Sequence, residues 1–510
     1  MKIGRLLIFA AMTAGALTIS ADAATAQDKT LRIAMNADPD VLDMTQSTNP
    51  PQGLATMDNV YDSLDNQNPK GDVIPGVAES WDIQDGGKVI VFHIRHGVTF
   101  HSGDPLTAKD VVWSHERYLK KGRFYGIFTR FLQKVEATDD YTVKFTFKQP
   151  DAQFIPVHPL PIASKTYYDR VGEAEFAKHP VGTGPYKIVN YVPGQYLDLE
   201  AYDKYWGPKP QVKKARFYFV KDDNTRLAKL QAGEVDLIMA TPYAAYDSLK
   251  KAGFTLVKLP VHPTQSIQFH LKNPNVPWYN VKVREAIAYA VDKKAIVKGL
   301  LHGLPTDYPR LMPDEVGYDP KLKDYNYDPA KARQLLKEAG YANGFTMPLY
   351  YSTGVYFGTQ ETAEAVSLYL KQNLNITTKT QGIELIQLLQ MIFKSAGDPK
   401  AEYVAVAGLP VANLATALEG VGLAYYGKAF GALYDDPALD KLYEEGNSKL
   451  DVAEQAPYIR QIMALEQKDL STITLWQYVD VYAMKKGITY TPGLHNLEIV
   501  YLPWVHEAKM

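Results

Sequence analysis

The hydrophobic period of the chain changes near residue 222, and this change constrains the fold more than any other feature. Before it, segments such as 88–94 and 141–147 alternate apolar and polar residues, which is typical of half-buried antiparallel strands. After it, amphipathic helical segments alternate with short apolar strands. Strand–helix alternation favours α/β lobes, whereas the early strands favour an α+β insertion. We therefore predict an α/β chain whose first half carries a mixed α+β insertion.

Capping residues indicate where the helices of the second half begin. Asp223 or Asn224 is predicted to cap a helix that ends at Gly233. A strand over residues 235–239 should follow it directly. Further helices are expected over residues 283–291, 292–303, 328–340, 361–373, 384–394 and 453–469. Three acidic pairs are interpreted as caps or turns rather than as ligands: Asp139 with Asp140, Asp222 with Asp223, and Asp435 with Asp436.

The N-terminus has the order of a secretory signal. Lys2 and Arg5 precede a mostly apolar run over residues 6–19, and small residues ending at Ala26 follow it. The run is shorter than the roughly 20 residues that a membrane span needs. We predict residues 1–26 to be a signal peptide cleaved after Ala26, so that the protein is exported to a periplasm.

Composition excludes several classes of protein. The chain has no cysteine, which excludes disulfides, thiol nucleophiles, iron–sulfur clusters and attachment of lipid to a cysteine. The formal net charge of −2 provides no broad field for nucleic acid or an anionic membrane. We expect a mature protein that is not lipid-anchored, does not bind nucleic acid and is monomeric.

Motifs that carry chemistry are mostly absent. The segment 422–429 (GLAYYGKA) resembles a phosphate-binding loop, but Ala429 stands where that loop needs Ser or Thr. No G-x-S-x-G or H-E-x-x-H motif occurs. His93, His96 and His101 lie close in sequence, but strand alternation would turn His93 and His96 to opposite faces. We expect no enzymatic activity, no cofactor and no metal site.

Six ordered segments resemble the family 5 extracytoplasmic solute-binding proteins, which are the peptide, opine and nickel receptors of ABC importers. They are residues 76–81 (GVAESW), 92–111 (FHIRHGVTFHSGDPLTAKDV), 181–186 (VGTGPY), 202–207 (YDKYWG), 230–238 (LQAGEVDLI) and 283–292 (VREAIAYAVD). Phe92, Ile94, Val98 and Phe100 read as core positions, and the GTGP loop before Tyr186 reads as needing unusual backbone angles. These segments therefore identify a scaffold and leave the ligand open.

The resemblance implies a two-lobed periplasmic binding protein fold with a hinge and an extra subdomain in lobe one. We expect two strand crossings, near residues 261–271 and 478–486, with the ligand enclosed between the lobes. The expected boundaries are 27–60, 180–265 and 485–510 for lobe one, 61–179 for its inserted subdomain, and 266–484 for lobe two.

The chain departs from the dipeptide receptors of that family in two loops. Those receptors resemble one another in using an Asp for the ligand's ammonium and an Arg for its carboxylate. The equivalent segments here are 404–418, which carries no charge, and 349–357, which lacks an Arg. Because a buried charge without a partner costs several kcal/mol, this argues against a zwitterionic dipeptide held by its ends. A counter-charge supplied by another loop remains the alternative.

The residues left at these positions suit a ligand with apolar faces and hydroxyl or amide groups. From lobe one, the loop after the first strand offers hydrogen-bonding side chains. The predicted ligand-binding residues are Ser47, Thr48, Asn49, Tyr350, Tyr351, Tyr356, Phe357, Gly408, Leu409, Asn413, Tyr425 and Tyr426.

The function expected from this reading is that of a periplasmic receptor. It would capture a peptide-like or other medium-sized organic solute by hinge closure and deliver it to the permease subunits of an ABC importer. An oligosaccharide or an opine-like conjugate is an alternative ligand. Two other classes stay open, a periplasmic peptide holdase and a secreted hydrolase, and the second requires a nucleophile or a carboxylate pair in the cleft.

Overall fold

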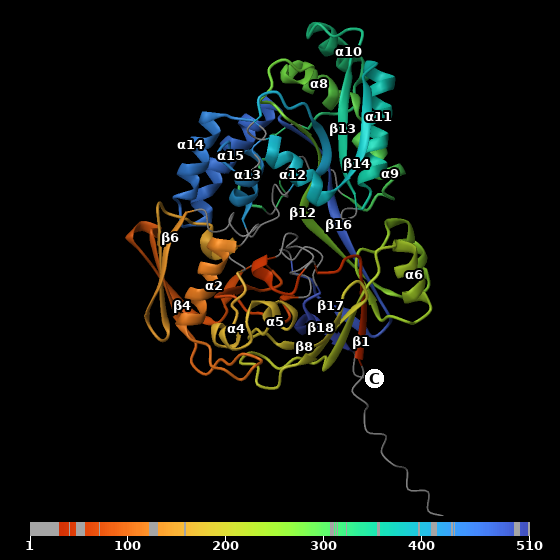
Figure 1. Ribbon diagram of the computed structural model, residues 1–510. Helices are drawn as coiled ribbons and strands as arrows, with labels where there is room; N and C mark the ends of the chain where they lie inside the picture. Colours follow the sequence, from red (N-terminus) through yellow and green to blue (C-terminus); the bar gives the residue numbers. More distant parts are fainter. Residues whose placement is uncertain are drawn as a thin grey trace, which may run out of the picture.

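The computed structural model describes most of the chain after residue 29, and its elements carry the labels of Figure 1. The described residues are 30–39, 41–46, 57–70, 72–121, 131–157, 160–305, 311, 313, 315–322, 324–353, 357–395, 398–409, 416–429, 432, 434–493 and 500–507. The predicted signal peptide lies outside them. Within these ranges, no helix has the length and apolar character that crossing a membrane requires.

One ten-stranded sheet runs through two lobes in the order β14-β13-β15-β12-β16-β11-β1-β10-β9-β8. Its two long central strands, β12 (Thr255–Phe269) and β16 (Thr472–Met484), pair antiparallel and are shared by both lobes. Lobe one contains β1 (Thr30–Met35), β8 (Tyr186–Val192), β9 (Tyr196–Ala201), β10 (Lys214–Phe219) and β11 (Leu237–Ile238). Lobe two contains β13 (Thr346–Thr353), β14 (Thr377–Glu384) and β15 (Val404–Leu409). Figure 1 shows β12 and β16 passing between the lobes.

Helices cover the sheet in both lobes. In lobe one they are α6 (Asp223–Gln231) and α7 (Tyr246–Lys251). In lobe two they are α8 (Val281–Ala290), α9 (Lys293–Gly299), α10 (Pro329–Glu338), α11 (Thr359–Leu374) and α12 (Leu385–Ser395). One large apolar core follows the sheet through both lobes and includes Ile33 of β1, Trp476 of β16 and Val366 of α11.

A second part of lobe two is helical. Its helices are α13 (Ala417–Tyr425), α14 (Pro437–Asn447) and α15 (Val452–Asp469). They pack on a core of their own that includes Leu418, Tyr443 and Ile462. In Figure 1 these blue helices lie beside the orange part of the chain.

The orange part is a subdomain inserted in lobe one. Its four-stranded sheet has the order β4-β5-β7-β6, formed by β4 (Ala78–Gln84), β5 (Val89–Ile94), β6 (Leu132–Asp139) and β7 (Thr142–Phe147). Smaller elements are β2 (Asp65–Gln67), β3 (Val73–Pro75), α2 (Ala108–Lys121), α3 (Phe154–Val157), α4 (Lys165–Val171) and α5 (Glu173–Lys178). Phe92, Ile94, Val98 and Phe100 are buried in its core, as expected. The predicted domain boundaries as such stay a prediction.

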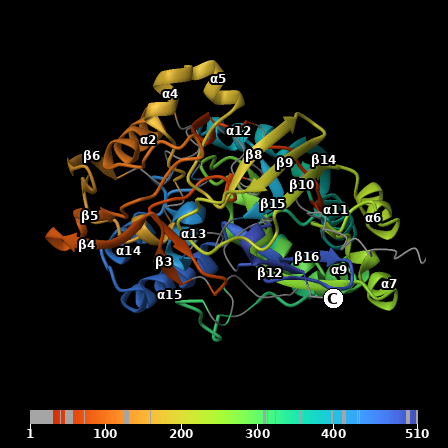
Figure 2. The same ribbon diagram turned by 90° about the horizontal axis from the view of Figure 1, so that it is seen from below.

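Short elements complete the chain. They are η1 (Met44–Gln46), η2 (Asp85–Gly87), η4 (Tyr243–Ala245), η5 (Pro277–Tyr279), η6 (Leu502–Trp504), β17 (Ile488–Tyr490) and β18 (Val505–Glu507). Figure 2 shows β8, β9 and β10 from below, with α4 and α5 at the edge of lobe one.

The predicted helix caps are mostly confirmed. Asp292 and Asp328 accept hydrogen bonds from the first turns of α9 and α10. The cap of α6 is Asp222, because its side chain accepts from the Thr225 N–H, and not Asp223 or Asn224. The helix after Asp292 ends at Gly299, earlier than expected, and positive φ angles at His302 and Gly303 then turn the chain.

The two glycines of the 181–186 motif allow close packing of backbones. Neither has a positive φ, so the expected unusual backbone angles are wrong. A Cβ at Gly182 would lie 2.2 Å from the Val60 carbonyl oxygen, and one at Gly184 would lie 2.6 Å from the Val60 carbonyl carbon. The Gly184 N–H donates to that oxygen at 2.9 Å. The glycines therefore hold the 181–186 segment against Val60, next to the point where the chain enters the inserted subdomain.

We predict that Gly182→Ala lowers the free energy of unfolding by about 1–3 kcal/mol or more, because the new methyl group meets backbone that cannot move aside. Gly299→Ala is the matched control, since no atom lies within 4 Å of the position where its Cβ would be and alanine favours the helix. Urea unfolding of both variants measures the difference. Equal stability of the two would contradict this account of the motif.

Asp62 is a buried carboxylate at the same junction. It accepts hydrogen bonds from Trp206 Nε1 at 2.8 Å and from Thr183 Oγ1 at 2.9 Å. Burial nevertheless raises its pKa to about 6, and these hydrogen bonds offset only part of that effect. As the pH rises from 4 to 6, the unfolded chain ionises at this residue before the folded chain does.

The wild type should therefore lose about 2 kcal/mol of unfolding free energy relative to Asp62→Asn between pH 4 and pH 7. Urea unfolding of both proteins at both pH values measures the four unfolding free energies that are compared. A difference that does not change with pH would show that the Asp62 pKa is ordinary.

Candidate functional site

The crossing of β12 and β16 joins the lobes and has an irregular register. Pro260 pairs with Val479, but the next paired residue of β12 is Thr264, opposite Gln477. Three residues of β12 therefore lie opposite one residue of β16, which bends the strand pair between the lobes. Reduced pairing at this point makes it the place where the lobes can rotate relative to each other.

A crevice of about 440 Å³ lies between the lobes against this crossing. Its volume is within the range of small-molecule sites, about 300–1,000 Å³. We call it the inter-lobe crevice. It is lined by Asn36, Lys221, Asp222, Asp223, Asn224, Ala240, Thr241, Tyr243, Ser352, Thr353, Phe357, Gly358, Thr359, Gln360, Glu361, Tyr478, Val479, Asp480 and Val481.

The wall from lobe one is formed at the carboxyl ends of parallel strands. β1 pairs parallel with both β10 and β11. Asn36 follows β1, residues 221–224 follow β10, and residues 240–243 follow β11. This edge is where open α/β sheets bind ligands, because helix N-termini and loops converge there.

The wall from lobe two is also formed at the carboxyl end of a parallel strand. β13 runs parallel to β14 and β15, and its last residues, Ser352 and Thr353, line the crevice. The first turn of α11 follows, with Gly358 at its N-cap in the left-handed region and no side chain bonded to the cap. Two lobes thus present the carboxyl ends of their strands to one space.

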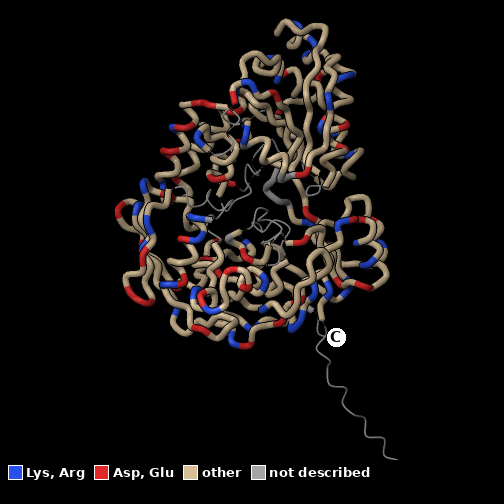
Figure 3. Tube along the Cα trace, in the orientation of Figure 1, with Lys and Arg blue, Asp and Glu red and all other residues tan. Residues whose placement is uncertain are grey.

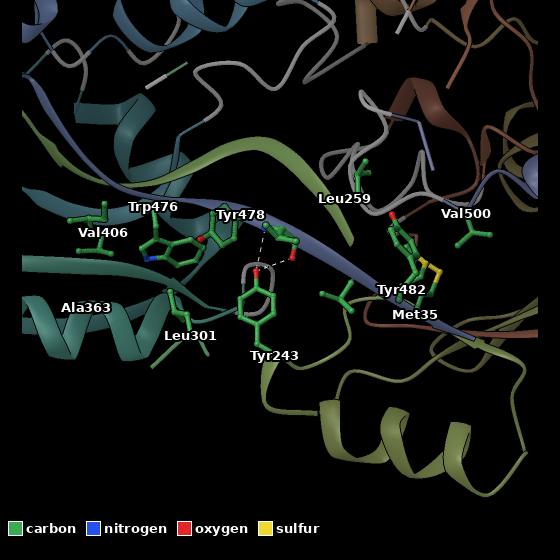
Figure 4. Packing of buried hydrophobic residues seen from close by; sticks show 14 of the residues in the cluster. Met35, Tyr243, Leu259, Leu301, Ala363, Val406, Trp476, Tyr478, Tyr482 and Val500 are labelled. Carbon is green, nitrogen blue, oxygen red and sulfur yellow. Dashed lines mark hydrogen bonds between the residues drawn. The ribbon is translucent and has the colours of Figure 1, made fainter. Parts of the chain in front are cut away.

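Tyr243 connects the lobes at the floor of the crevice. Its hydroxyl donates to the Val479 carbonyl at 2.9 Å and accepts from the Val479 N–H at 3.3 Å. Its ring meets Phe357 of lobe two edge to face, with ring centroids 4.7 Å apart. Figure 4 shows Tyr243 pointing up to the β16 strand, next to Tyr478. These rings provide apolar faces for a ligand.

Tyr478 belongs to a buried network that crosses the hinge. Its hydroxyl donates to Gln265 Oε1 on β12 and lies 3.1 Å from Thr359 Oγ1 at the start of α11. The Gln265 Nε2 atom is buried without a hydrogen-bond partner. Both crossing strands and the first turn of α11 are therefore linked behind the crevice.

Within the described part of the chain, two hydroxyl groups in the crevice walls have no hydrogen-bond partner. Thr241 Oγ1 comes from lobe one and Ser352 Oγ from lobe two, and each residue is 2% exposed. A buried hydroxyl without a partner destabilises a folded protein by about 1–3 kcal/mol. Such groups at the wall of a crevice are expected where a ligand supplies the missing hydrogen bond.

The charged groups at the crevice are mainly acidic. Lys221 is accompanied by Asp222, Asp223, Glu361 and Asp480. Asp222 caps α6, and Asp223 accepts from Arg226, whose guanidinium also donates to backbone carbonyls. None of the described residues that line the crevice is an arginine. Carboxylate and amide groups beside aromatic rings suit a ligand rich in hydroxyl or amide groups.

The predicted ligand-binding residues are distributed as follows. Ser47, Thr48, Asn49, Tyr356 and Asn413 lie outside the described residues. Phe357 lines the inter-lobe crevice. Ligand binding by any of them stays a prediction.

Tyr350 and Tyr351 point to opposite faces of β13, as neighbours on a strand must. The Tyr350 ring packs against the small core around Leu388, and the Tyr351 ring lies over Gly382. Gly408 and Leu409 end β15 opposite Gln265 and Thr264, at the hinge. Their backbone lies close to the crossing, and Gly408 is not among the described residues that line the crevice.

Tyr425 and Tyr426 lie in the core of the helical part of lobe two. Tyr425 is 1% exposed, and its hydroxyl lies 3.2 Å from Thr472 Oγ1. Tyr426 is buried against Tyr443 and donates to Glu444 at 2.8 Å. The described structure gives both residues a packing role.

Histidines do not form a metal centre in the part of the chain that is described, which holds no group of three potential ligands. His93 lies 2.9 Å from Asp82, and His96 stacks on Tyr141. His101 is buried beside the Gly184 carbonyl, and burial lowers its pKa to about 4. These contacts hold the inserted subdomain together.

Sequence reasoning missed Thr241, Tyr243, Tyr478 and Asp480. A signal for the first two existed, because a polar residue directly after a predicted parallel strand is a candidate at the carboxyl edge of a sheet. No such signal marked Tyr478 and Asp480, which are interior to a strand.

We predict that Thr241→Val and Ser352→Ala each raise the unfolding free energy of the unliganded protein by about 1 kcal/mol, because each removes an unsatisfied buried oxygen. Thr183→Val is the control, since its hydroxyl is bonded to Asp62, and it should destabilise the protein. Urea unfolding compares the three. Destabilisation of all three to a similar degree would mean that the two crevice hydroxyls have partners.

Comparisons with known proteins show which family this architecture is similar to. The profile of the bacterial extracellular solute-binding proteins, family 5, middle region, matches residues 72–398. The chain is 36% identical over 302 residues to heme-binding protein A of Haemophilus influenzae, covering 54% of this chain and 55% of that one. It is 33% identical over 307 residues to the dipeptide-binding protein of Escherichia coli, covering 55% and 57%. The chain thus spans about half the length of the curated relatives it matches.

Solved structures share the whole fold. The periplasmic binding protein DppA from Helicobacter pylori, in complex with the peptide STSA, superposes with a TM-score of 0.82 at 25% identity, covering 94% of this chain and 98% of that one. AgaA from A. tumefaciens R10, in complex with agropinic acid, gives 0.81 at 25% identity, covering 94% and 99%. The two-lobed periplasmic binding protein fold is therefore confirmed.

Proposed function

This chain belongs to family 5 of the bacterial extracellular solute-binding proteins, and we propose that it is a periplasmic receptor of an ABC importer. It captures a peptide-like or other medium-sized organic solute between its lobes and delivers it to the permease subunits. The observation that carries the proposal is the inter-lobe crevice, which is built from the carboxyl ends of strands in both lobes against the shared β12–β16 crossing.

Hinge closure follows from that position. A ligand that touches Thr241 in lobe one and Ser352 in lobe two makes its full set of contacts only when the lobes are close together. Its affinity for the closed form then exceeds its affinity for the open form, and this difference is what shifts the population. A few residues of the crossing absorb the changes in backbone angle when the lobes rotate.

The chemistry of the crevice narrows the ligand class. Aromatic rings from Tyr243 and Phe357 offer apolar faces, and Asn36, Thr241 and Ser352 offer uncharged hydrogen-bonding groups. Since the described lining residues include no arginine, they offer a free carboxylate no bidentate partner. We favour a solute with hydroxyl or amide groups: a longer or blocked peptide, an opine-like conjugate or an oligosaccharide.

The receptor role includes export. We propose cleavage after Ala26 and a mature protein that is free in the periplasm, monomeric and without catalytic activity. Basic and acidic residues are interspersed over both lobes (Figure 3), so no broad electrostatic field favours nucleic acid.

A thermal-shift screen of residues 27–510 against blocked and free peptides, opines, oligosaccharides and Ni²⁺ tests the function. A ligand at 100 times its dissociation constant should stabilise the protein by about 2.7 kcal/mol. We expect one ligand class, with an uncharged or hydroxyl-rich member, to stabilise the protein clearly more than the other classes. Thr241→Val and Ser352→Ala should each raise the dissociation constant of that ligand by about tenfold or more.

Weak stabilisation by many unrelated peptides would indicate a holdase and overturn the receptor proposal. Tight binding of free dipeptides would overturn the ligand class while leaving the receptor in place.

A further inference from the structure

The two lobes touch at a second place, away from the hinge. Residues 150–153, which follow β7 in the inserted subdomain, meet Thr416, Asn447 and Leu450 of the helical part of lobe two. Figures 1 and 2 both place α14 beside the inserted subdomain. The apolar cores on the two sides of this contact are separate.

The apolar half of the contact is formed by Leu450 on Gly87. A Cβ added at Gly87 would lie 2.9 Å from Leu450 Cδ2 and 3.4 Å from Pro150 Cβ. With this contact in place, Leu450 remains 40% exposed. Because Gly87 has no side chain, it leaves space for the Leu450 side chain of the opposite lobe.

The polar half consists of hydrogen bonds between the lobes. The Ala152 N–H donates to the Asn447 carbonyl at 3.3 Å, and Asn447 Nδ2 donates to the Pro150 carbonyl at 3.5 Å. The Thr416 hydroxyl donates to Gln153 Oε1. Thr416 also caps α13 by accepting from the Glu419 N–H at 3.2 Å, so the contact ends on a helix terminus.

We propose that these residues form a closure latch, a contact between the inserted subdomain and lobe two that exists only while the lobes are closed. The latch rests on the proposed receptor function, since it needs lobes that open and close. The chain segments on its two sides are connected through lobe one and the β12–β16 crossing, so rotation at the crossing must separate them.

Buried polar atoms without partners weaken the closure latch. Gln153 Nε2 and Asn447 Oδ1 are buried in it without partners, and their residues are 3% and 1% exposed. Opening gives both atoms to water, which offsets part of the hydrogen bonds and apolar contact that opening breaks. A contact balanced in this way stabilises the closed form without keeping the empty receptor closed. Ligand binding then determines which of the two forms is populated.

A disulfide trap tests whether the contact forms in solution. The chain has no cysteine, so only introduced thiols can react. In Ala152→Cys/Asn447→Cys, the 3.3 Å backbone hydrogen bond brings the two residues within the span of a disulfide. The double variant should oxidise to a monomeric disulfide under mild oxidant, and each single variant should not.

Small-angle scattering of paired glycine variants tests whether the contact controls opening. Gly87→Ala puts a methyl group against Leu450, whereas Gly86→Ala meets no atom within 4 Å, and both glycines have positive φ. Backbone strain is therefore common to both. Gly87→Ala should increase the radius of gyration of the unliganded protein, and Gly86→Ala should leave it unchanged.

Leu450→Ala provides an unstrained second variant and should shift the scattering in the same direction as Gly87→Ala. Circular dichroism and urea unfolding establish that each variant is folded. Failure of the disulfide to form, or the same radius of gyration in Gly87→Ala, Leu450→Ala and wild type, would overturn the latch. Neither measurement uses a ligand, so that outcome is separate from a failed ligand screen, which would overturn the receptor function.

Discussion

The antiparallel pairing of β12 with β16 is the interaction on which the rest of the structure depends. These strands belong to one sheet that continues into both lobes, so their hydrogen bonds hold the lobes together and fix the direction in which each lobe presents its parallel strands. The ladder is interrupted by register shifts between Pro260 and Thr264 and again between Gln265 and Ser266. The lobes are thus joined firmly along the strands and can bend where the pairing is interrupted.

Some of the buried polar atoms that have no partner among the described residues lie where the lobes face each other. Thr241 and Ser352 leave such oxygens at the crevice, and Gln153 and Asn447 leave such polar atoms at the second contact. Each lowers the stability of the closed, empty molecule. If every buried polar group of the empty, closed receptor had a partner, a ligand would have little reason to prefer the closed form. Only a difference in affinity between the two forms shifts their populations.

Local signals in the sequence predicted much of the scaffold. Asp292 and Asp328 were identifiable as caps because each precedes an amphipathic run, and strand alternation located β5 and β7. The binding surface was harder to predict, since it depends on which strands become neighbours. Tyr425 and Tyr426 illustrate this, because aromatic residues in a helix serve a core as readily as a cleft, and only the packing of α13 on α14 and α15 distinguishes the two.

The central claim is that one ligand is bound by both lobes at the crossing. Hydrogen–deuterium exchange of the mature protein, with and without the solute that stabilises it most, tests this directly. The account predicts slower exchange in 240–243 of lobe one, 357–361 of lobe two and 478–481 of β16 together, all of which line the crevice. Slower exchange confined to one lobe, or located away from these three segments, would contradict it.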